Sequence, residues 1–286
     1  MKYKGQFCIF ILTHGRADNV ITYKTLEDIT DYPIYFVCDD GDEQLKQYKK
    51  NFGKDRVCIF SKEAQFEDID RMDNFGKLKM IGFARNACFD IAEKLGYRYF
   101  VEFDDDYTGF GFTFDKNAVY YHHNIHEKKI LDGVFDSYLD LLNSSPKMLT
   151  LSMAQGGDFV GAGFASSIRV KRKAMNSFFC DTRKKFLFTN CLNEDVNMYV
   201  RENNRGNVVL QTNICRLTQL ATQQNKGGMT DIYVDCGTYV KSFYSVIVNP
   251  SAVHIQSMGV TNMRLHHHVN YNKCCPKIIR AEVKKQ

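Results

Sequence analysis

The chain has 286 residues, of which 44% are hydrophobic and 25% are charged, and its formal net charge is +5. These values exclude a disordered or fibrous protein and fit one large globular domain or one domain with two lobes. No apolar run reaches the roughly 18 residues that cross a bilayer, and the N-terminus has no signal-peptide core, so we expect a cytoplasmic protein without membrane contact.

Short apolar runs alternate with amphipathic helices in the first half of the chain. The strand-like runs lie at residues 7–13, 34–40, 56–61, 98–104 and 147–154. Their near-continuous hydrophobicity is typical of strands that are covered on both faces. Helical spacing is found at 84–96, where it stops at Gly96, and at about 126–142. This alternation predicts a mostly parallel sheet flanked by helices, an α/β fold.

The second half is less regular. It has one clear helical signal at 193–203, for which Asn193 is a candidate N-cap, and a strand-like aromatic run at 237–248. The tail from Lys277 is short and basic. Ten cysteines without a CxxC pair favour reduced, mostly buried thiols.

Charge is distributed unequally along the chain. Residues 1–156 carry 20 Lys and Arg against 25 Asp and Glu, whereas residues 157–286 carry 18 against 8. The net charges of the two parts are therefore −5 and +10. Basic clusters at 169–173 and 183–185 concentrate the positive charge. The second half is expected to meet something anionic, although a solvated basic face would give the same pattern.

Polar side chains follow three of the predicted strands. The first strand is followed by Thr13, His14 and Arg16, the second by Asp39 and Asp40, and the fourth by Asp104, Asp105 and Asp106. Ligands of open α/β sheets bind beyond the carboxyl ends of the strands. Asp104 and Asp106 could both approach a hard divalent cation there, whereas the alternative is an acidic turn that caps the next loop.

Two further groups could complete such a site. Glu194 and Asp195 open the helix at 193–203, where the helix dipole stabilises negative charge, so an ordinary helix start is the simpler interpretation. His266 and His267 lie in a run of three histidines, which could supply an imidazole to the cation. Three histidines in a row are also common on surfaces without any function.

These motifs together resemble GT-A glycosyltransferases. The stretches "FILTHGRADNV", "FVCDD", "ARNACFDIA" and "YFVEFDDDY" match the nucleotide-sugar half of that fold in order, and "NEDV" matches its acceptor-side acid pair. The chain is most similar to the TET-associated glycosyltransferases of bacteriophages, which sugar-modify 5-hydroxymethylcytosine in viral DNA. The motifs "KAMNSFFCDT", "GGMTDIYVDCGTYVKSFYS" and "MRLHHHVNYN" extend this resemblance over residues 7–279.

The resemblance implies a single GT-A-like domain with a Rossmann-type mixed sheet and a less regular acceptor-side lobe. Its nucleotide-sugar half would span about 5–156 and its acceptor half about 157–279. Asp104 and Asp106 would bind manganese or magnesium with support from Asp105, and His266 or His267 would be the third protein contact. The residues assigned to the uridine are Thr13, His14 and Arg16, with Asp39 or Asp40. Arg85 would contact the same nucleotide or Asp104, whereas the alternative is a salt bridge that only holds the loop.

The resemblance also implies a mechanism. Negative charge grows on the nucleoside diphosphate as its bond to the sugar breaks, and a cation neutralises that charge. The acceptor alcohol is a poor nucleophile, so a carboxylate must take its proton. Asp195 or Glu194 is the expected base, in a direct displacement that inverts the anomeric carbon. The expected donor is a UDP-sugar, with glucose as the sugar.

The expected acceptor is DNA that contains 5-hydroxymethylcytosine. Because a base inside a duplex is out of reach, the enzyme must flip it or act on exposed strands, with phosphate contacts and aromatic stacking. The candidate stacking residues are Phe178, Phe179, Tyr239, Phe243 and Tyr244, although most of them are expected to belong to the core. Alternatives are a protein or polysaccharide acceptor, a metal-dependent nuclease or hydrolase, and a non-catalytic DNA-binding module. The oligomeric state is left open.

Overall fold

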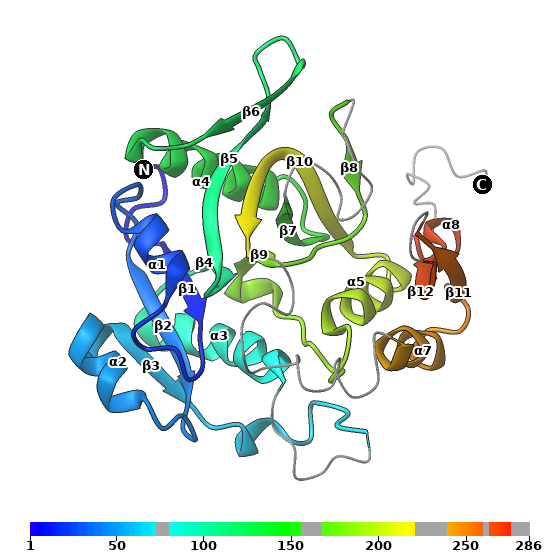
Figure 1. Ribbon diagram of the computed structural model, residues 1–286, viewed down its shortest axis with the longest axis horizontal. Helices are drawn as coiled ribbons and strands as arrows, with labels where there is room; N and C mark the ends of the chain where they lie inside the picture. The colour runs from blue at the N-terminus through cyan, green and yellow to red at the C-terminus, as the bar shows by residue number, and fades with distance from the viewer. Residues whose placement is uncertain (73–79, 156–166, 221–238, 260–262, 276–286) are drawn as a thin grey trace.

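A computed structural model describes residues 1–72, 80–155, 167–220, 239–259 and 263–275. A ten-stranded sheet forms its centre (Figure 1). Its strands in spatial order are β3 (Val57–Phe60), β2 (Ile34–Asp39), β1 (Phe7–Leu12), β4 (Tyr99–Asp104), β9 (Ser177–Asp181), β7 (Met148–Gln155), β10 (Val208–Gln219), β5 (Tyr107–Phe114) and β6 (Tyr120–Asn124), with β8 (Val170–Lys171) paired to β10. The strand-like runs predicted in the first half of the chain all lie in this sheet.

Most strands of the sheet run in one direction. β3, β2, β1 and β4 pair in parallel, and β7 pairs in parallel with β10. β9 joins these two groups because it pairs antiparallel with both β4 and β7. β5 and β8 pair antiparallel with β10, and β6 with β5. The predicted mixed, mostly parallel α/β sheet is confirmed, and both halves of the chain contribute strands to it.

Helices pack on the sheet and at its edges. The α-helices are α1 (Ile21–Leu26), α2 (Leu45–Phe52), α3 (Ile81–Leu95), α4 (Lys128–Asn143), α5 (Glu194–Asn204), α7 (Tyr239–Val248) and α8 (Tyr271–Cys274), and the 3₁₀ turns are η1 (Lys54–Arg56), η2 (Glu63–Gln65) and η3 (Thr182–Lys184). Gly96 ends α3 as predicted: at φ +81° it adopts the left-handed conformation, and its N–H bonds the carbonyls of Ala92 and Glu93.

The central strand β1 is buried on both faces. Phe7, Ile9 and Ile11 belong to a core cluster with side chains of α1, α2 and α4. Phe10 and Leu12 belong to a second cluster with side chains of α3 and α5. Successive side chains of a strand point to opposite faces, so an almost continuous apolar run is what a strand between two helical layers requires. This packing fixes where the polar residues after β1 emerge.

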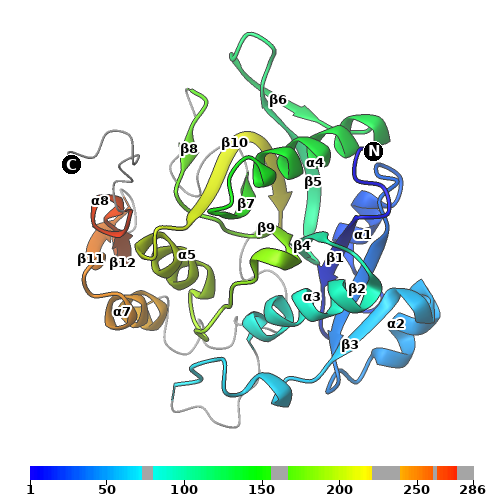
Figure 2. The ribbon, with the colours of Figure 1, turned by 180° about the vertical axis from the view of Figure 1, so that it is seen from behind.

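The C-terminal elements form a small unit of their own. β11 (Val253–Met258) and β12 (Arg264–Val269) pair antiparallel, α7 packs against both, and α8 packs against α5. Both ribbon views place this unit at the end of the molecule opposite α1 and α2 (Figures 1 and 2). It lies within the second half of the chain, which the sequence predicted to be less regular, and it contacts α5, which packs on β10 of the main sheet.

The strand predicted at 237–248 is wrong. Its first two residues lie outside the described ranges, and the rest forms the helix α7. Val240, Tyr244 and Val248 pack into one cluster with Cys191 and Leu192, which is a spacing of four residues on one helical face. The aromatic and β-branched side chains favour a strand locally, but this tertiary packing outweighs their propensity.

Two expectations about the whole chain can be examined on the described part. All nine cysteines within it are free, as predicted, and Cys236 lies outside it. Among the helices of that part, none combines the length and the apolar character that crossing a membrane demands. The basic tail from Lys277 lies outside the described ranges.

Candidate active site

The loop after β1 is tied to the end of β4 by Asp105. Thr13 Oγ1 donates to Asp105 Oδ2 at 2.8 Å, and Arg16 Nη1 donates to Asp105 Oδ1 at 2.6 Å. The hydroxyl of Tyr48 completes the junction, with Thr13 Oγ1 at 2.9 Å and the Arg16 backbone N–H at 2.8 Å. Burial raises the pKa of Asp105, against the effect of Arg16. Asp105 therefore fixes the loop that carries His14.

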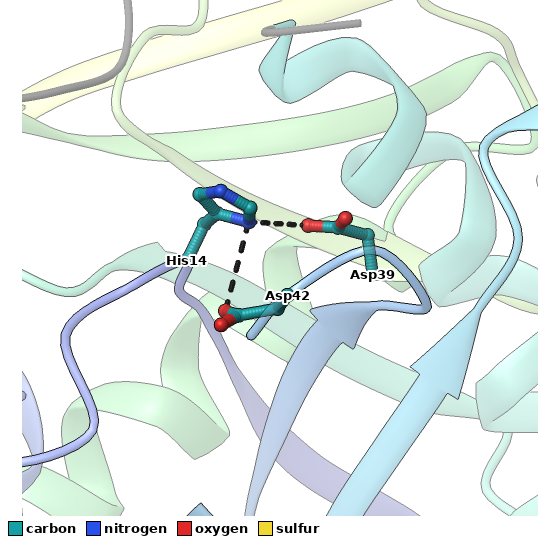
Figure 3. A group of neighbouring side chains, drawn as sticks. All are labelled: His14, Asp39 and Asp42. Carbon is teal, nitrogen blue, oxygen red and sulfur yellow. Dashed lines mark hydrogen bonds and ion pairs between the residues drawn. The ribbon is translucent and has the colours of Figure 1, made fainter. Parts of the chain in front are cut away.

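Three residues meet beside this loop, at the end of β2. His14 and Asp39 were predicted as site residues, and Asp42 was not. His14 Nδ1 lies 2.6 Å from Asp39 Oδ2 and 3.6 Å from Asp42 Oδ2 (Figure 3). Lys62, which follows β3, places its Nζ 3.0 Å from Asp39 Oδ1. Asp39 is buried, whereas its predicted alternative Asp40 is exposed. Of the two aspartates, Asp39 is the one held in the cluster.

The electrostatics of this cluster are those of a compact ion-pair group. The hydrogen bond with Asp39 raises the pKa of His14. Although burial works in the opposite direction, hydrogen bonds with His14 and Lys62 lower the pKa of Asp39 to about 2. His14, Asp39 and Asp42 form the one trio of His, Cys, Asp or Glu, among the residues described, whose ligand atoms lie close enough to hold a metal ion. The Lys62 ammonium already supplies positive charge there.

The aspartate run at the end of β4 divides its side chains between two surroundings. Asp105 turns inward to Thr13 and Arg16, and Asp104 keeps 26% of its side chain exposed while its Oδ1 accepts from Arg85 Nη2 at 3.2 Å. Burial, and then the charges of Asp104 and Asp105, raise the pKa of Asp106 to about 6. A divalent cation would relieve this repulsion, because carboxylate oxygens are hard ligands.

Arg85 joins the aspartate run to the acid pair of α5. Its side chain is 3% exposed, and its Nε lies 3.4 Å from Glu194 Oε1. Its Nη1 lies 3.5 Å from Glu102 Oε2, inside the sheet. Burial raises the pKa of Glu102 to about 8 in spite of this contact. The two acidic motifs, which are 90 residues apart in sequence, therefore share one buried guanidinium.

The acid pair occupies the first turn of α5. Burial and the neighbouring Asp195 raise the pKa of Glu194, and burial raises the pKa of Asp195, whose Oδ1 accepts from the backbone N–H of Val196 at 2.7 Å. A carboxylate with a raised pKa is a better proton acceptor near neutral pH. The pair is thus chemically suited to the role of a base.

Asn193 does not cap α5 in the way that the sequence suggested. It precedes the helix at φ +47°, and its side chain makes no capping hydrogen bond. Instead its Nδ2 donates to the carbonyl of Lys241 and to Ser245 Oγ, each at 3.0 Å, and lies 3.2 Å from His267 Nδ1. The cap prediction failed because α7 and β12 offer the amide partners that no local pattern reveals.

The two candidate histidines lie on β12 next to this junction. His266 Nδ1 lies 2.9 Å from the carbonyl of His267, and their rings are 4.2 Å apart. Burial, followed by the neighbouring His266 and Lys241, lowers the pKa of His267 to about 3. His267 is therefore neutral, the form in which an imidazole binds metal. Neither histidine belongs to the group of His14, Asp39 and Asp42 that could hold a metal ion. Both histidines remain candidate ligands of a cation.

Some residues of the site were not anticipated from the sequence. Asp42 lies in the run that contains Asp39, and Lys62 follows the end of β3, so the rule that identified the other strand ends could have found both. Glu102 carried no such signal, because it is one buried charge within an apolar strand. Asn193 and Lys241 meet only through tertiary structure.

The predicted basic clusters separate into structural and accessible parts. Lys184 Nζ bonds the carbonyls of Leu142, Ser145 and Met148, and Lys185 pairs with Asp90. The side chains of Lys171, Arg172, His268, Asn270, Tyr271 and Asn272 line an open groove of about 680 Å³. Those lining residues include no carboxylate.

The aromatic candidates also separate. Phe178, Phe179 and Tyr244 are buried in the core, as expected for most of these residues, and cannot stack on a base. Tyr239 and Phe243 are 45% and 46% exposed on α7. The sequence did not separate the exposed from the buried aromatic residues of α7, because a strand had been predicted there and a strand distributes its side chains over its faces differently from a helix.

Comparisons with known proteins give structural matches at low sequence identity. A comparison with curated proteins yields no match. Among solved structures, glucosyl-3-phosphoglycerate synthase from Mycobacterium tuberculosis in complex with Mn²⁺, UDP and glucosyl-3-phosphoglycerate is 8% identical, with a TM-score of 0.47 over 92% of this chain and 87% of that chain. The same enzyme with Mn²⁺ and UDP-glucose is 8% identical, with a TM-score of 0.45 over 92% and 86%.

The family model described as TET-Associated Glycosyltransferase matches residues 7–228, most of the chain. This match covers β1, β2 and β4 with their polar ends, Arg85, and the acid pair of α5. The protein therefore belongs to the TET-associated glycosyltransferase family and is a glycosyltransferase.

Proposed function

We propose that the protein transfers a sugar, glucose in the simplest case, from a UDP-sugar to the hydroxymethyl group of 5-hydroxymethylcytosine in DNA. The observation that carries the proposal is the contact of one buried guanidinium, that of Arg85, with both Asp104 and Glu194. A group that holds the leaving diphosphate and a group that activates the acceptor must lie close together in a direct displacement.

The first half of the chain supplies the donor side in this proposal. Thr13, His14 and Arg16 stand on the loop after β1, and the buried carboxylate of Asp39 stays ionised through its bonds with His14 and Lys62. An ionised carboxylate can accept the N–H of a uracil ring. We propose about 5–156 as the nucleotide-sugar half and about 157–279 as the acceptor half, which share one sheet.

Asp104 and Asp106 fit a partly hydrated divalent cation, manganese or magnesium. They offer hard oxygen ligands, and burial, followed by the charges of Asp104 and Asp105, raises the pKa of Asp106, so a cation would stabilise its ionised form. His266 or His267 is the further candidate ligand. Such a cation would neutralise charge on the departing diphosphate. Asp105 would hold the loop beneath it through Thr13 and Arg16.

Glu194 or Asp195 would take the proton of the acceptor hydroxyl. Their burial raises their pKa values, which favours proton transfer near neutral pH. Attack from the side opposite the diphosphate would invert the anomeric carbon. Arg85 would remain beneath both carboxyls, because it is too deeply buried to contact the nucleotide itself.

An anionic acceptor is supported by the distribution of charge. Residues 157–286 carry a net charge of +10, and the open groove between β8 and β12 is lined by Lys171, Arg172 and His268 without a carboxylate. Cationic side chains that neutralise phosphates supply most of the affinity in nucleic-acid binding. A neutral polysaccharide would gain nothing from this surface.

Mass spectrometry of 5-hydroxymethylcytosine DNA tests the proposal most directly. The DNA is incubated with the protein, a panel of UDP-sugars and Mn²⁺, and a parallel series contains EDTA. We expect the mass of one hexose on modified cytosines, only with a donor and only without EDTA. Transfer to a protein or glycan in place of DNA would contradict the acceptor, and cleavage of DNA without a donor would indicate a nuclease.

Replacing the acid pair tests the base. Glu194→Gln or Asp195→Asn, whichever removes the base, should lower kcat about 100-fold or more, because no carboxylate then takes the proton of the attacking hydroxyl. The Kd for UDP in the presence of Mn²⁺ should rise less than about tenfold, because neither carboxyl is assigned to the donor. An equal loss of kcat and of UDP affinity in both variants would refute this role.

A further inference from the structure

Arg85 distributes its three nitrogens over three carboxyl groups. Nη2 faces Asp104 at 3.2 Å, Nε faces Glu194 at 3.4 Å, and Nη1 faces Glu102 at 3.5 Å. The planar guanidinium is suited to such an arrangement because its donors point in fixed, divergent directions. One positive charge is thereby shared between the end of β4 and the start of α5.

The surroundings hold this guanidinium in place. Its central carbon lies 4.7 Å from the ring centroid of Phe178 and 5.6 Å from that of Phe188, and both rings are fully buried. Glu102 is 0% exposed, and both of its carboxyl oxygens lack a hydrogen-bond partner. Nε and Nη1 of Arg85 likewise approach carboxyls without completing a hydrogen bond. Only the contact with Asp104 is therefore a complete hydrogen bond, and the contacts with Glu194 and Glu102 are electrostatic.

Asp104 and Glu194 compete for this one charge. When Glu194 is ionised, its negative charge offsets part of the positive potential of Arg85. The potential at Asp104 is then more negative, and it attracts a cation more strongly. When Glu194 loses its charge, Asp104 receives a larger share of the guanidinium and attracts a cation less strongly. We propose that Arg85 is a positioning residue that couples cation and diphosphate binding at Asp104 to the charge of the acceptor-side Glu194.

This inference rests on the proposed function, because it places the cation at Asp104. The test is a titration of UDP in the presence of Mn²⁺, measured by calorimetry on the wild type, Glu194→Gln, Arg85→Lys and the double variant. Glu194→Gln should raise Kd about fivefold in the wild-type background. In the Arg85→Lys background the same change should alter Kd less than about twofold, because a single ammonium cannot face both carboxyls.

Two further variants separate charge from packing. Glu194→Asp retains the charge and should stay within about twofold of the wild-type Kd. Glu202→Gln is the control on the same helix: its carboxyl is 4% exposed, against 16% for Glu194, and its partners are Arg201 and Arg205. It too should leave Kd within about twofold. Thermal unfolding verifies that each variant is folded.

The outcomes are distinct. An unchanged Kd in Glu194→Gln would overturn the coupling by itself, even if Arg85→Lys did not fold. The same fivefold effect in both backgrounds would show that Arg85 does not transmit it, and would also overturn the inference. If the wild type bound no UDP with Mn²⁺, the proposed donor would fail and the coupling with it, which is a different result from wild-type binding that is insensitive to Glu194.

Discussion

The pKa of Asp39 depends on charged side chains from two other segments of the chain. His14 reaches it from the loop after β1, and Lys62 from the loop after β3. Because its folded pKa, about 2, lies below the unfolded value, Asp39 stabilises the protein above the unfolded pKa and loses this contribution as the pH falls through the folded pKa. The raised pKa of His14 has the opposite sign, so its contribution is lost as the pH rises through it.

The difference in free energy of unfolding between the wild type and Asp39→Asn should therefore be largest in mildly acidic solution, at about 2 kcal/mol. It should shrink below about pH 4 as Asp39 is protonated, and again at higher pH as His14 loses its proton. Urea unfolding across this range measures it. Asp40→Asn, at the exposed neighbour, should change stability by less than about 0.5 kcal/mol. A difference that is independent of pH would contradict the ion-pair account.

At this scale the sequence predicted which polar residues follow the strands better than it predicted their contacts. The polar residues after β1, β2 and β4 were identified because a strand end is a local signal. Arg85 was placed on the nucleotide or on Asp104, and the structure shows its contact with Asp104. Its contact with Glu194 depends on how α5 packs beside β4, and the spacing of residues along the chain does not predict that packing.

The element scale shows the same division. In the first half, β1, β2, β3, β4, β7, α3 and α4 follow from apolar periodicity, because each is covered by the central core. The short helices α1 and α2 and the strands β5 and β6 were not predicted. α7 was missed, because its apolar residues contact a small cluster whose members come from distant segments. The junction of α5, α7 and β12 at Asn193 is likewise tertiary, with hydrogen bonds to residues about 50 positions away.

The end of α3 provides a test of an element boundary. Gly96→Ala should lower the free energy of unfolding by about 1 kcal/mol, since Gly96 has φ +81° and an alanine there is strained although nothing lies within 4 Å of its Cβ. Gly133→Ala in α4 is the matched control. It also has open space but no strained φ, so it should stabilise by about 0.5–1 kcal/mol. Urea unfolding at neutral pH compares the two, and equal shifts would rule out a left-handed cap.

At the scale of the whole molecule, the two halves differ in charge while they share a sheet. The strands β9, β7, β10 and β5 alternate between the two parts of the chain, so the second part shares the main sheet with the first. The acidic end of β4 and Lys171, which lines the basic groove from β8, consequently belong to one sheet. This arrangement suits a reaction in which a small anionic donor and a large anionic acceptor approach from different sides.

Binding to 5-hydroxymethylcytosine DNA should therefore depend strongly on salt, with an affinity that falls steeply between about 50 mM and about 200 mM. Neutralising Arg169 and Lys171, as Arg169→Gln and Lys171→Gln, should lower the slope of log affinity against log salt by about 1 for each DNA phosphate that the variant no longer neutralises. Arg172 is a poorer choice for this test, because it also bonds Asn203 and the carbonyl of Asn207. Lys94→Gln, an exposed lysine at the end of α3, is the matched control and should leave the slope unchanged. Fluorescence anisotropy of labelled DNA gives the affinity at each salt concentration and hence the slope. If the control reduces the slope as much as the Arg169 and Lys171 variants do, the DNA is attracted by net charge alone and this basic surface is not its path.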